Sequence, residues 1–448
     1  MKPLLLTNAL IINEDMRYPA DILIDKGRIK KIASLITSRP EWQVIDVQGK
    51  WVIPGMIDDQ VHFREPGLTH KGTIASESAA AVMGGITSFM EMPNVTPPTT
   101  TRQALSEKFQ RASQCSLANY SFYFGATNDN LDELKALRVS EACGVKVFMG
   151  ASTGNMLVDD ERILESIFAN APCLVATHCE HTPTIKHNEE AWRGRFGNAI
   201  PPGEHAEIRS VEACLKSSRQ AVSLAKKYRT RLHVLHISTA DELALFDAAP
   251  TLEALRKKTI TAEACVHHLY FNHDDYAMLG HRLKCNPSVK SSSHQEALLR
   301  GVNEGIIDII ATDHAPHLLE EKQNDYFAAP SGLPLVQHAL CALLDMSSRG
   351  IFTPEMVVRK TSHAVAERFQ LKDRGYIREG YWADLVVIDP LAHQQIIREN
   401  VAYKCGWSPF EGRIFSGGAV DMTLVNGQLI WNGHSLHQHY GLPLEFCR

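Results

Sequence analysis

The sequence predicts an α/β protein whose largest part is a (β/α)8 barrel of the TIM type, with a small β-sandwich domain formed by the N- and C-terminal segments. Three observations support this prediction. Eight short apolar runs of strand-like composition occur between residues 51 and 313, about 20 to 50 residues separate successive runs, and polar residues gather where the runs end. A closed parallel sheet surrounded by helices is the economical fold for such a βα series.

The two ends of the chain contain a different pattern, of short apolar strands joined by tight turns. Asp25-Lys-Gly27 near one end and Asn426-Gly427 near the other are hairpin-type turn signals. We therefore expect both ends to build one β-domain together. The expected division of the chain is residues 1–50 and 373–448 for this domain and residues 51–372 for the barrel.

The barrel strands are predicted from apolar runs rich in β-branched and aromatic residues. They are Trp51–Asp58, Thr87–Met92, Ser121–Gly125, Gly144–Phe148, Leu174–His178, Arg231–His236, Ile260–Glu263 and Ile307–Asp313. Helix-like stretches lie between them, for example at residues 209–228 and 294–305. The segment 314–334 has little regular pattern and is long enough to cover the mouth of the barrel.

Polar residues follow the predicted strands at the ends where a barrel of this kind places its chemistry. His62 follows the first strand, Asn94 the second, Lys146 lies near the end of the fourth, and His178, His236 and Asp313 end the fifth, sixth and eighth. Scattered polar residues would not sort in this way. We therefore expect these side chains to converge on one site.

The converging residues indicate a metal-dependent hydrolase. Imidazole and carboxylate groups are ligands that suit a zinc-like cation. Lys146 ends an apolar run, where burial of a cation is costly, whereas a carbamylated Lys146 would be an anionic ligand. The expected ligand sets are His178, His236 and Lys146 for one metal, and His62, Lys146 and Asp313 for a second. Asp313 is also expected to move a proton from the attacking water to a leaving nitrogen.

Other polar residues near the same mouth suggest a small anionic substrate. Arg64 lies two residues after His62 and offers bidentate binding to a carboxylate, and His317 could add a further contact to the anion. Asn94 and Asn286 could each present a donor and an acceptor to an amide or imide edge.

Each of these residues also has an interpretation without function. A single histidine at a strand end is usually a hydrogen-bonded structural residue, and Lys146 could reach water with its long side chain. Arg64 and Glu65 could form a surface ion pair. Turn formation before proline would explain Asn94 and Asn286 equally well, and His233, His267 and His268 are interpreted as core or ligand-supporting residues. The joint placement favours the functional interpretation.

Composition narrows the class of protein further. The net charge is −5 without blocks of like charge, so neither nucleic acid nor a membrane surface is expected as a partner. No apolar run is long enough to span a membrane, and the N-terminus does not look like a signal peptide. The 10 cysteines show no CxxC pairs, which favours buried free thiols in a reducing cytoplasm.

With these residues in place, the chain resembles the dihydroorotases of the amidohydrolase superfamily. The matching motifs are Asp58–Gly67, Glu91–Asn94, Gly144–Met156, Thr177–Glu180, Leu232–Thr239, Lys284–Pro287 and Thr312–His317. The resemblance covers nearly the whole chain. HFREPG together with DHAPH is fairly specific to dihydroorotases and their near relatives, whereas the metal ligands alone would also fit hydantoinases and allantoinases.

The resemblance implies reversible cyclisation of N-carbamoyl-L-aspartate to L-dihydroorotate in pyrimidine biosynthesis. It also implies a carbamylated Lys146, one or two zinc ions per chain, and a substrate carboxylate held by Arg64, Asn94 and His317. Homodimers or homotetramers are common in this group, and some dihydroorotase-like chains associate with aspartate transcarbamoylase.

One residue departs from the pattern of the group. The first strand usually carries His-x-His, but here it reads Gln60-Val-His62. A neutral amide is a weak ligand, so we expect the metal shared by His62 and Asp313 to bind less tightly. Two alternatives remain open at this point: an allantoinase-type or hydantoinase-type cyclic amidase, and an inactive structural partner of aspartate transcarbamoylase.

Overall fold

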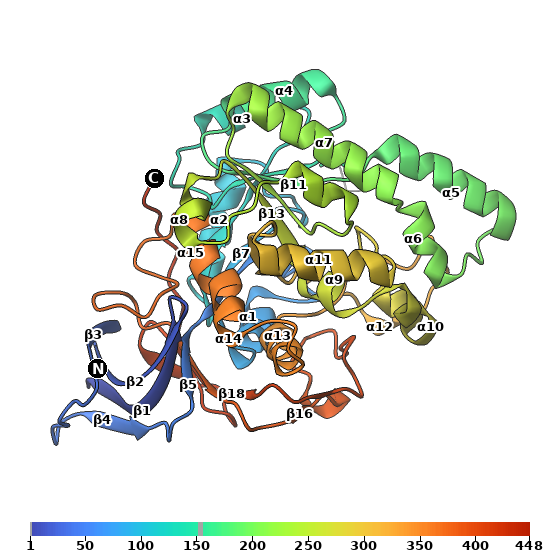
Figure 1. The fold of residues 1–448 in the computed structure, drawn as a ribbon. Coiled ribbons are helices and arrows are strands. Elements are labelled where there is room, and N and C mark those ends of the chain that lie inside the picture. The colour runs from blue at the N-terminus through green and yellow to red at the C-terminus, as the bar shows by residue number, and fades with distance from the viewer. Residues whose placement is uncertain (1, 151–155) are drawn as a thin grey trace.

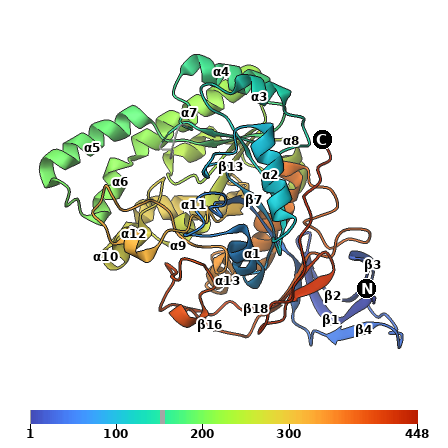
Figure 2. The ribbon, with the colours of Figure 1, turned by 180° about the vertical axis from the view of Figure 1, so that it is seen from behind.

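The computed structural model describes residues 2–150 and 156–448. The molecule consists of a helix-covered barrel and a small sheet at one side (Figure 1). In this sheet the N-terminal strands lie beside strands from near the C-terminus, and the same arrangement is visible from behind (Figure 2). The predicted barrel with a small β-domain is therefore confirmed.

The barrel is a ring of parallel strands in which each neighbour in space follows in sequence. Its strands are β6 (Met56–Val61), β7 (Ile86–Glu91), β8 (Asn119–Phe122), β9 (Phe124–Gly125), β10 (Val145–Phe148), β11 (Val175–His178), β12 (Leu232–Val234), β13 (Ile260–Cys265) and β14 (Ile309–Ala311). β8 and β9 are separated only by Tyr123 and form one strand position, which gives the expected eight. A parallel bridge between Val61 and His314 closes the ring.

The strand predicted at Trp51–Asp58 is wrong as a single element. β5 (Trp51–Pro54) pairs with strands of the small sheet, and the first barrel strand begins only at Met56. Gly55 lies between the two, where a Cβ atom would stand 2.1 Å from Thr87 Oγ1. The chain thus changes sheets at a position that only glycine can occupy, within a run that is apolar throughout.

The small sheet interleaves the two ends of the chain in the order β3-β2-β1-β5-β15-β18-β19, with β4 also paired to β1. The strands not yet given are β1 (Leu4–Asn13), β2 (Met16–Asp25), β3 (Arg28–Ala33), β4 (Gln43–Asp46), β15 (Leu385–Asp389), β18 (Ala419–Val425) and β19 (Gln428–Trp431), and a separate ribbon contains β16 (Gln394–Gln395) and β17 (Ile414–Phe415). Leu6, Ile22 and Val387 belong to its apolar core.

Helices surround the barrel. They are α1 (Ile74–Met83), α2 (Arg102–Ala112), α3 (Leu131–Ala136), α4 (Glu161–Asn170), α5 (Thr182–Phe196), α6 (His205–Ile208), α7 (Val211–Tyr228), α8 (Leu252–Lys257), α9 (Val266–Tyr270), α10 (Tyr276–Leu279), α11 (Ser292–Glu304), α12 (Leu319–Lys322), α13 (Ala339–Ser348), α14 (Pro354–Val358) and α15 (Ala364–Phe369). Within the described residues, no helix is long and apolar enough to cross a membrane. Seven of the 10 cysteines are buried, and all are free.

Part of the C-terminal segment packs on the barrel instead of the small sheet. Trp407, Phe410 and Phe415 are buried in the same apolar cluster as the barrel strands. We propose that the barrel domain begins at Gly55 and not at residue 51, because β5 pairs with the small sheet and β6 with the barrel. We propose to keep the second boundary at residue 373.

Candidate active site

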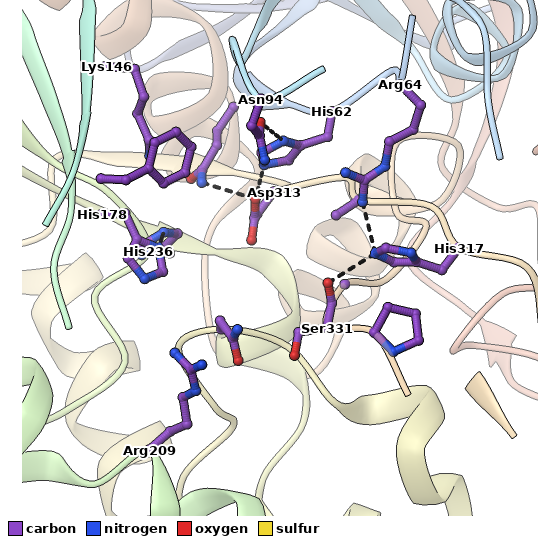
Figure 3. A pocket seen from close by; sticks show the side chains of 16 residues that line it. His62, Arg64, Asn94, Lys146, His178, Arg209, His236, Asp313, His317 and Ser331 are labelled. Atoms are coloured by element: carbon purple, nitrogen blue, oxygen red, sulfur yellow. Dashed lines mark hydrogen bonds and ion pairs between the residues drawn. The ribbon is translucent and has the colours of Figure 1, made fainter. Parts of the chain in front are cut away.

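All ten residues predicted for the site line one cavity of about 320 Å³ at the carboxyl ends of the barrel strands (Figure 3). They are Gln60, His62, Arg64, Asn94, Lys146, His178, His236, Asn286, Asp313 and His317. The segment after the eighth strand also lines the cavity, through Ala315 and residues 330–332. Residues 151–155 of the GVKVFMGASTGNM motif lie outside the described residues.

The backbone is strained at three of these positions. Arg64, His236 and Asp313 have positive φ angles of 70°, 40° and 50°. Residues other than glycine adopt this region only at an energetic cost, and such residues cluster at functional sites. The buried carboxylate of Glu263 helps to hold His236, because its Oε1 accepts a hydrogen bond of 3.1 Å from the His236 backbone N–H.

One half of the cavity is suited to a cation bound by two imidazoles. His178 Nδ1 lies 3.0 Å from His236 Nε2, and on its other side His178 Nε2 lies 2.9 Å from Glu180 Oε2. The carboxylate favours a proton on Nε2, so Nδ1 keeps its lone pair toward His236. Two zinc–nitrogen bonds of about 2.1 Å at a tetrahedral angle need roughly 3.4 Å between the nitrogens, so these donors fit with little movement.

Glu180 is anchored by a second charge. Arg209 donates a hydrogen bond of 2.6 Å to the same Oε2 atom, and this ion pair is buried. Burial opposes ionisation, but Arg209 and His178 together lower the pKa of Glu180 to about 2. The carboxylate is therefore charged at neutral pH and fixes the orientation of the His178 ring.

We expect Glu180→Gln to weaken metal binding by about 10- to 100-fold, because the neutral amide no longer selects the ring orientation and tautomer of His178. Competition with a chelator, read as metal retained per chain, measures this effect. Glu165→Gln is the control, since Glu165 forms an ion pair with Lys227 on the surface, away from the cavity. Equal metal retention in the two variants would contradict this role of Glu180.

The other half of the cavity is organised around Asp313. Its Oδ1 lies 3.0 Å from His62 Nε2 and accepts a hydrogen bond of 3.0 Å from Gln60 Nε2. His62 Nδ1 lies 2.8 Å from Asn94 Oδ1, which favours a proton on Nδ1 and leaves the Nε2 lone pair facing Asp313. Two electron-pair donors at this distance suit a shared cation, but the Gln60 amide already occupies part of the space beside Asp313.

Lys146 lies in β10 and is almost fully buried, with 1% of its surface exposed. Its Nζ lies 4.6 Å from the centre of the Phe148 ring. Burial lowers the pKa of Lys146 to about 8, although Asp313 and Glu263 oppose this shift. The neutral amine, which is the form that reacts with carbon dioxide, is therefore far more abundant near neutral pH than in an exposed lysine.

Arg64 and His317 occupy the opposite wall of the cavity. Arg64 Nη2 lies 3.0 Å from His317 Nε2, and Arg64 Nε donates to the Pro316 carbonyl at 3.1 Å. Arg64 is 6% exposed, and burial lowers its pKa to about 10, so it remains a cation. Among the described residues, no carboxylate forms an ion pair with Arg64. A buried guanidinium of this kind calls for an anion from outside the protein.

Two charged residues were not predicted from the sequence: Arg209, which lines the cavity, and Glu180, which supports His178 from behind. Arg209 lies between α6 and α7, away from any strand end, so no periodicity pointed to it. Glu180 belongs to the THCE motif and follows His178 by two residues. This proximity to a predicted metal ligand was the sequence signal that could have identified it. Asn286, which was predicted, has a buried Oδ1 without a hydrogen-bond partner among the described residues.

Comparison with known proteins identifies the family. The model of the amidohydrolase family matches residues 51–430. The chain belongs to the amidohydrolase family. It is 32% identical over 442 residues to a dihydroorotase of Methanosarcina acetivorans, covering 97% of this chain and 93% of the relative. A dihydroorotase of Halobacterium salinarum is 35% identical, covering 93% and 94%, and an allantoinase of Solibacter usitatus is 32% identical, covering 92% and 90%.

Solved structures confirm the fold. The L-hydantoinase from Arthrobacter aurescens superposes with a TM-score of 0.91 at 25% identity, covering 99% of this chain and all of that chain. The dihydropyrimidinase from Brevibacillus agri gives 0.88 at 23% identity, covering 98% and 97%. The chain is thus a hydrolase that acts on C–N bonds of cyclic amides, and its family is typically metal-dependent.

Proposed function

We propose that this protein is a dihydroorotase that interconverts N-carbamoyl-L-aspartate and L-dihydroorotate in pyrimidine synthesis. The observation that carries the proposal is Arg64, a buried cation on the cavity wall that forms no ion pair among the described residues. L-Dihydroorotate has one carboxylate, which a guanidinium binds in bidentate fashion. Relatives named dihydroorotase cover nearly the whole chain and support the same activity.

A divalent cation of the zinc type fits the donors of the cavity. Lys146 as a carbamate, His178 and His236 would hold it, and His62 and Asp313 with the same carbamate would hold a second. The bound cation would lower the pKa of water and polarise a carbonyl group. Zinc itself, and the number of ions, are part of the proposal.

The side chains of this protein then have separate roles. Arg64, Asn94 and His317 hold the substrate carboxylate, and Asn286 Oδ1 accepts a hydrogen bond from a ring N–H. In hydrolysis, Asp313 takes the proton of the attacking water and gives it to the ring nitrogen as the C–N bond of the imide breaks. In cyclisation, Asp313 removes the proton from the carbamoyl nitrogen and delivers it to the departing hydroxyl group.

The alternative of another cyclic amidase is favoured by the allantoinase relative and by the hydantoinase fold. It does not explain Arg64, since a neutral cyclic amide offers this cation no negative charge. Turnover of dihydroorotate, allantoin and hydantoin by the purified protein, with and without added zinc, separates the possibilities. Faster turnover of allantoin or hydantoin would overturn the proposal, and an absence of metal-dependent turnover would favour a structural partner of aspartate transcarbamoylase.

Gln60 is expected to lower the affinity of the site for the second metal. Its Nε2 donates to Asp313, and its Oε1 accepts a contact of 3.6 Å from Cys265 Sγ, so no oxygen of Gln60 faces the space beside Asp313. We expect Gln60→His to tighten the second metal by about tenfold or more. Isothermal titration of the metal-free protein tests this, with Gln60→Leu as the control that removes the amide without adding an imidazole. Identical stoichiometry and affinity in both variants would contradict our account of Gln60.

The proposed partner is the small anionic substrate. We also propose a homodimer or homotetramer, and association with aspartate transcarbamoylase as a testable alternative. Light scattering of the purified chain, alone and with the transcarbamoylase, checks both proposals.

A further inference from the structure

A second group of metal-binding side chains lies at the end of β13 and the start of α9. Donor atoms of Cys265, His267 and His268 all lie within 4.8 Å of one another, and the three residues are buried. They do not line the cavity described above. α9 begins directly after the carboxyl end of β13 and lies beside α11 (Figure 1).

Each of the two histidines has at least one ring nitrogen without a hydrogen-bond partner among the described residues. His268 Nε2 donates to the Pro287 carbonyl at 3.0 Å, which fixes the proton on that nitrogen, and Nδ1 has no partner among the described residues. Both ring nitrogens of His267 are likewise buried and make no hydrogen bond of normal geometry in the described part of the chain, although the Thr312 backbone lies close enough to raise the pKa of this ring. Burial lowers the pKa of His267 to about 4, so this ring is neutral. Buried polar atoms rarely remain unsatisfied, so a missing partner is indicated.

A neighbouring group contains a histidine whose two ring nitrogens both have partners. Asp59, His233 and Glu263 also bring donor atoms within 4.8 Å of one another. There, His233 Nδ1 lies 2.8 Å from Thr261 Oγ1, and Nε2 lies 3.2 Å from Asp59 and 3.3 Å from Glu263. Both nitrogens of the His233 ring have partners, unlike those of His267, although neither carboxylate oxygen of Asp59 has a hydrogen-bond partner in the described part of the chain.

Two side-chain oxygen atoms lie close to the Cys265 Sγ atom. Glu263 Oε1 lies 3.5 Å from the Cys265 Sγ atom, and Gln60 Oε1 lies 3.6 Å from it. A sulfur atom and two imidazole nitrogens are ligands that zinc prefers, and an oxygen can complete a four-coordinate site. The Pro287 carbonyl plays the part of the outer hydrogen-bond acceptor that usually orients a ligating histidine.

We propose that Cys265, His267 and His268 bind a divalent cation of the zinc type, separate from the cation of the active site. On binding, the Cys265 thiol releases its proton to solvent and the thiolate forms the metal–sulfur bond. The ion joins the last residue of β13 to the first turn of α9. It also lies next to Gln60, whose amide contacts this group on one side and Asp313 on the other.

Cobalt substitution tests the proposal without reference to activity. The active-site ligands include no cysteine, so a thiolate-to-cobalt absorption band in the near ultraviolet reports this second site alone. We expect the band in the cobalt-loaded wild-type protein and in Lys146→Ala, and its loss in Cys265→Ser. Cys285→Ser is the matched control, because Cys285 is also buried and its Sγ donates to the same Pro287 carbonyl at 3.2 Å. This control should keep the band.

Metal analysis provides a second measurement. Lys146→Ala should retain one ion per chain after gel filtration, and the double variant Lys146→Ala/His268→Gln should retain none, with circular dichroism showing that both are folded. No thiolate band in the loaded wild type, a band that survives in Cys265→Ser, or a metal-free Lys146→Ala protein would each overturn the proposal. Hydrolysis of dihydroorotate by the wild type is a separate readout, so failure here leaves the proposed activity intact.

Discussion

Replacement of Lys146 by alanine is expected to abolish turnover of dihydroorotate and to lower the metal content of the protein. The substitution removes the one group that could serve as an anionic ligand to both active-site cations. Loss of the metal's electrostatic contribution, several kcal/mol, corresponds to a decrease in kcat/KM of about 10³-fold or more. Plasma emission analysis and a spectrophotometric assay of dihydroorotate hydrolysis measure the two effects.

A second buried lysine provides the control for this experiment. Burial also lowers the pKa of Lys360 to about 8, but its Nζ donates to the Ile307 carbonyl, away from the cavity. Lys360→Met should keep the metal content of the wild type. Intact-mass measurement should show one carbamate on the wild-type protein and none on Lys146→Ala. A wild-type metal content in Lys146→Ala would contradict the carbamate.

Replacement of Arg64 by methionine is expected to reduce kcat/KM for dihydroorotate by about 10²- to 10³-fold, mainly through KM. The substitution keeps much of the apolar stem and removes the cation that would bind the substrate carboxylate, and loss of one partner of a buried charge pair costs about 2–5 kcal/mol. Steady-state kinetics on the metal-loaded variant measure the change.

Neutral cyclic amides serve as the internal control for Arg64. Any residual activity of the wild type on hydantoin should be nearly unchanged in Arg64→Met, because hydantoin brings no carboxylate to the guanidinium. Metal content should also be unchanged. An equal loss on both substrates would assign Arg64 a structural role, through its hydrogen bond to the Pro316 carbonyl and its contact with His317.

The sequence was sufficient for the barrel and for the ten predicted residues that line the cavity, because a parallel barrel places all strand ends at one mouth. His178 and Asp313 end runs that are apolar and β-branched, so their convergence followed from periodicity alone. The division of 51–58 into two strands could not be predicted in this way. The division depends on pairing of β5 with β15, a strand that lies more than 300 residues later in the sequence. The local run is apolar on both sides of Gly55 and does not show where one strand ends.

The supporting groups around the site were harder to predict than the groups that line it. Arg209 reaches Glu180 from a connection between two helices, a contact that depends on how these helices pack. His267 and His268 were interpreted as core or supporting residues, and burial is what the structure shows. The free lone pairs beside Cys265 emerge only from the positions of Pro287 and Gln60, which lie far away in the sequence.

The interleaving of the two chain ends has a consequence for synthesis on the ribosome. β5 pairs with β1 on one side and with β15 on the other, and β15 in turn needs β18. In a nascent chain that has completed the barrel, one edge of β5 stays without a pairing partner until residues 385–389 emerge. Unpaired strand edges of this kind promote association between chains. Chaperone dependence and aggregation of prematurely terminated products should therefore be greatest for stops placed just before Leu385.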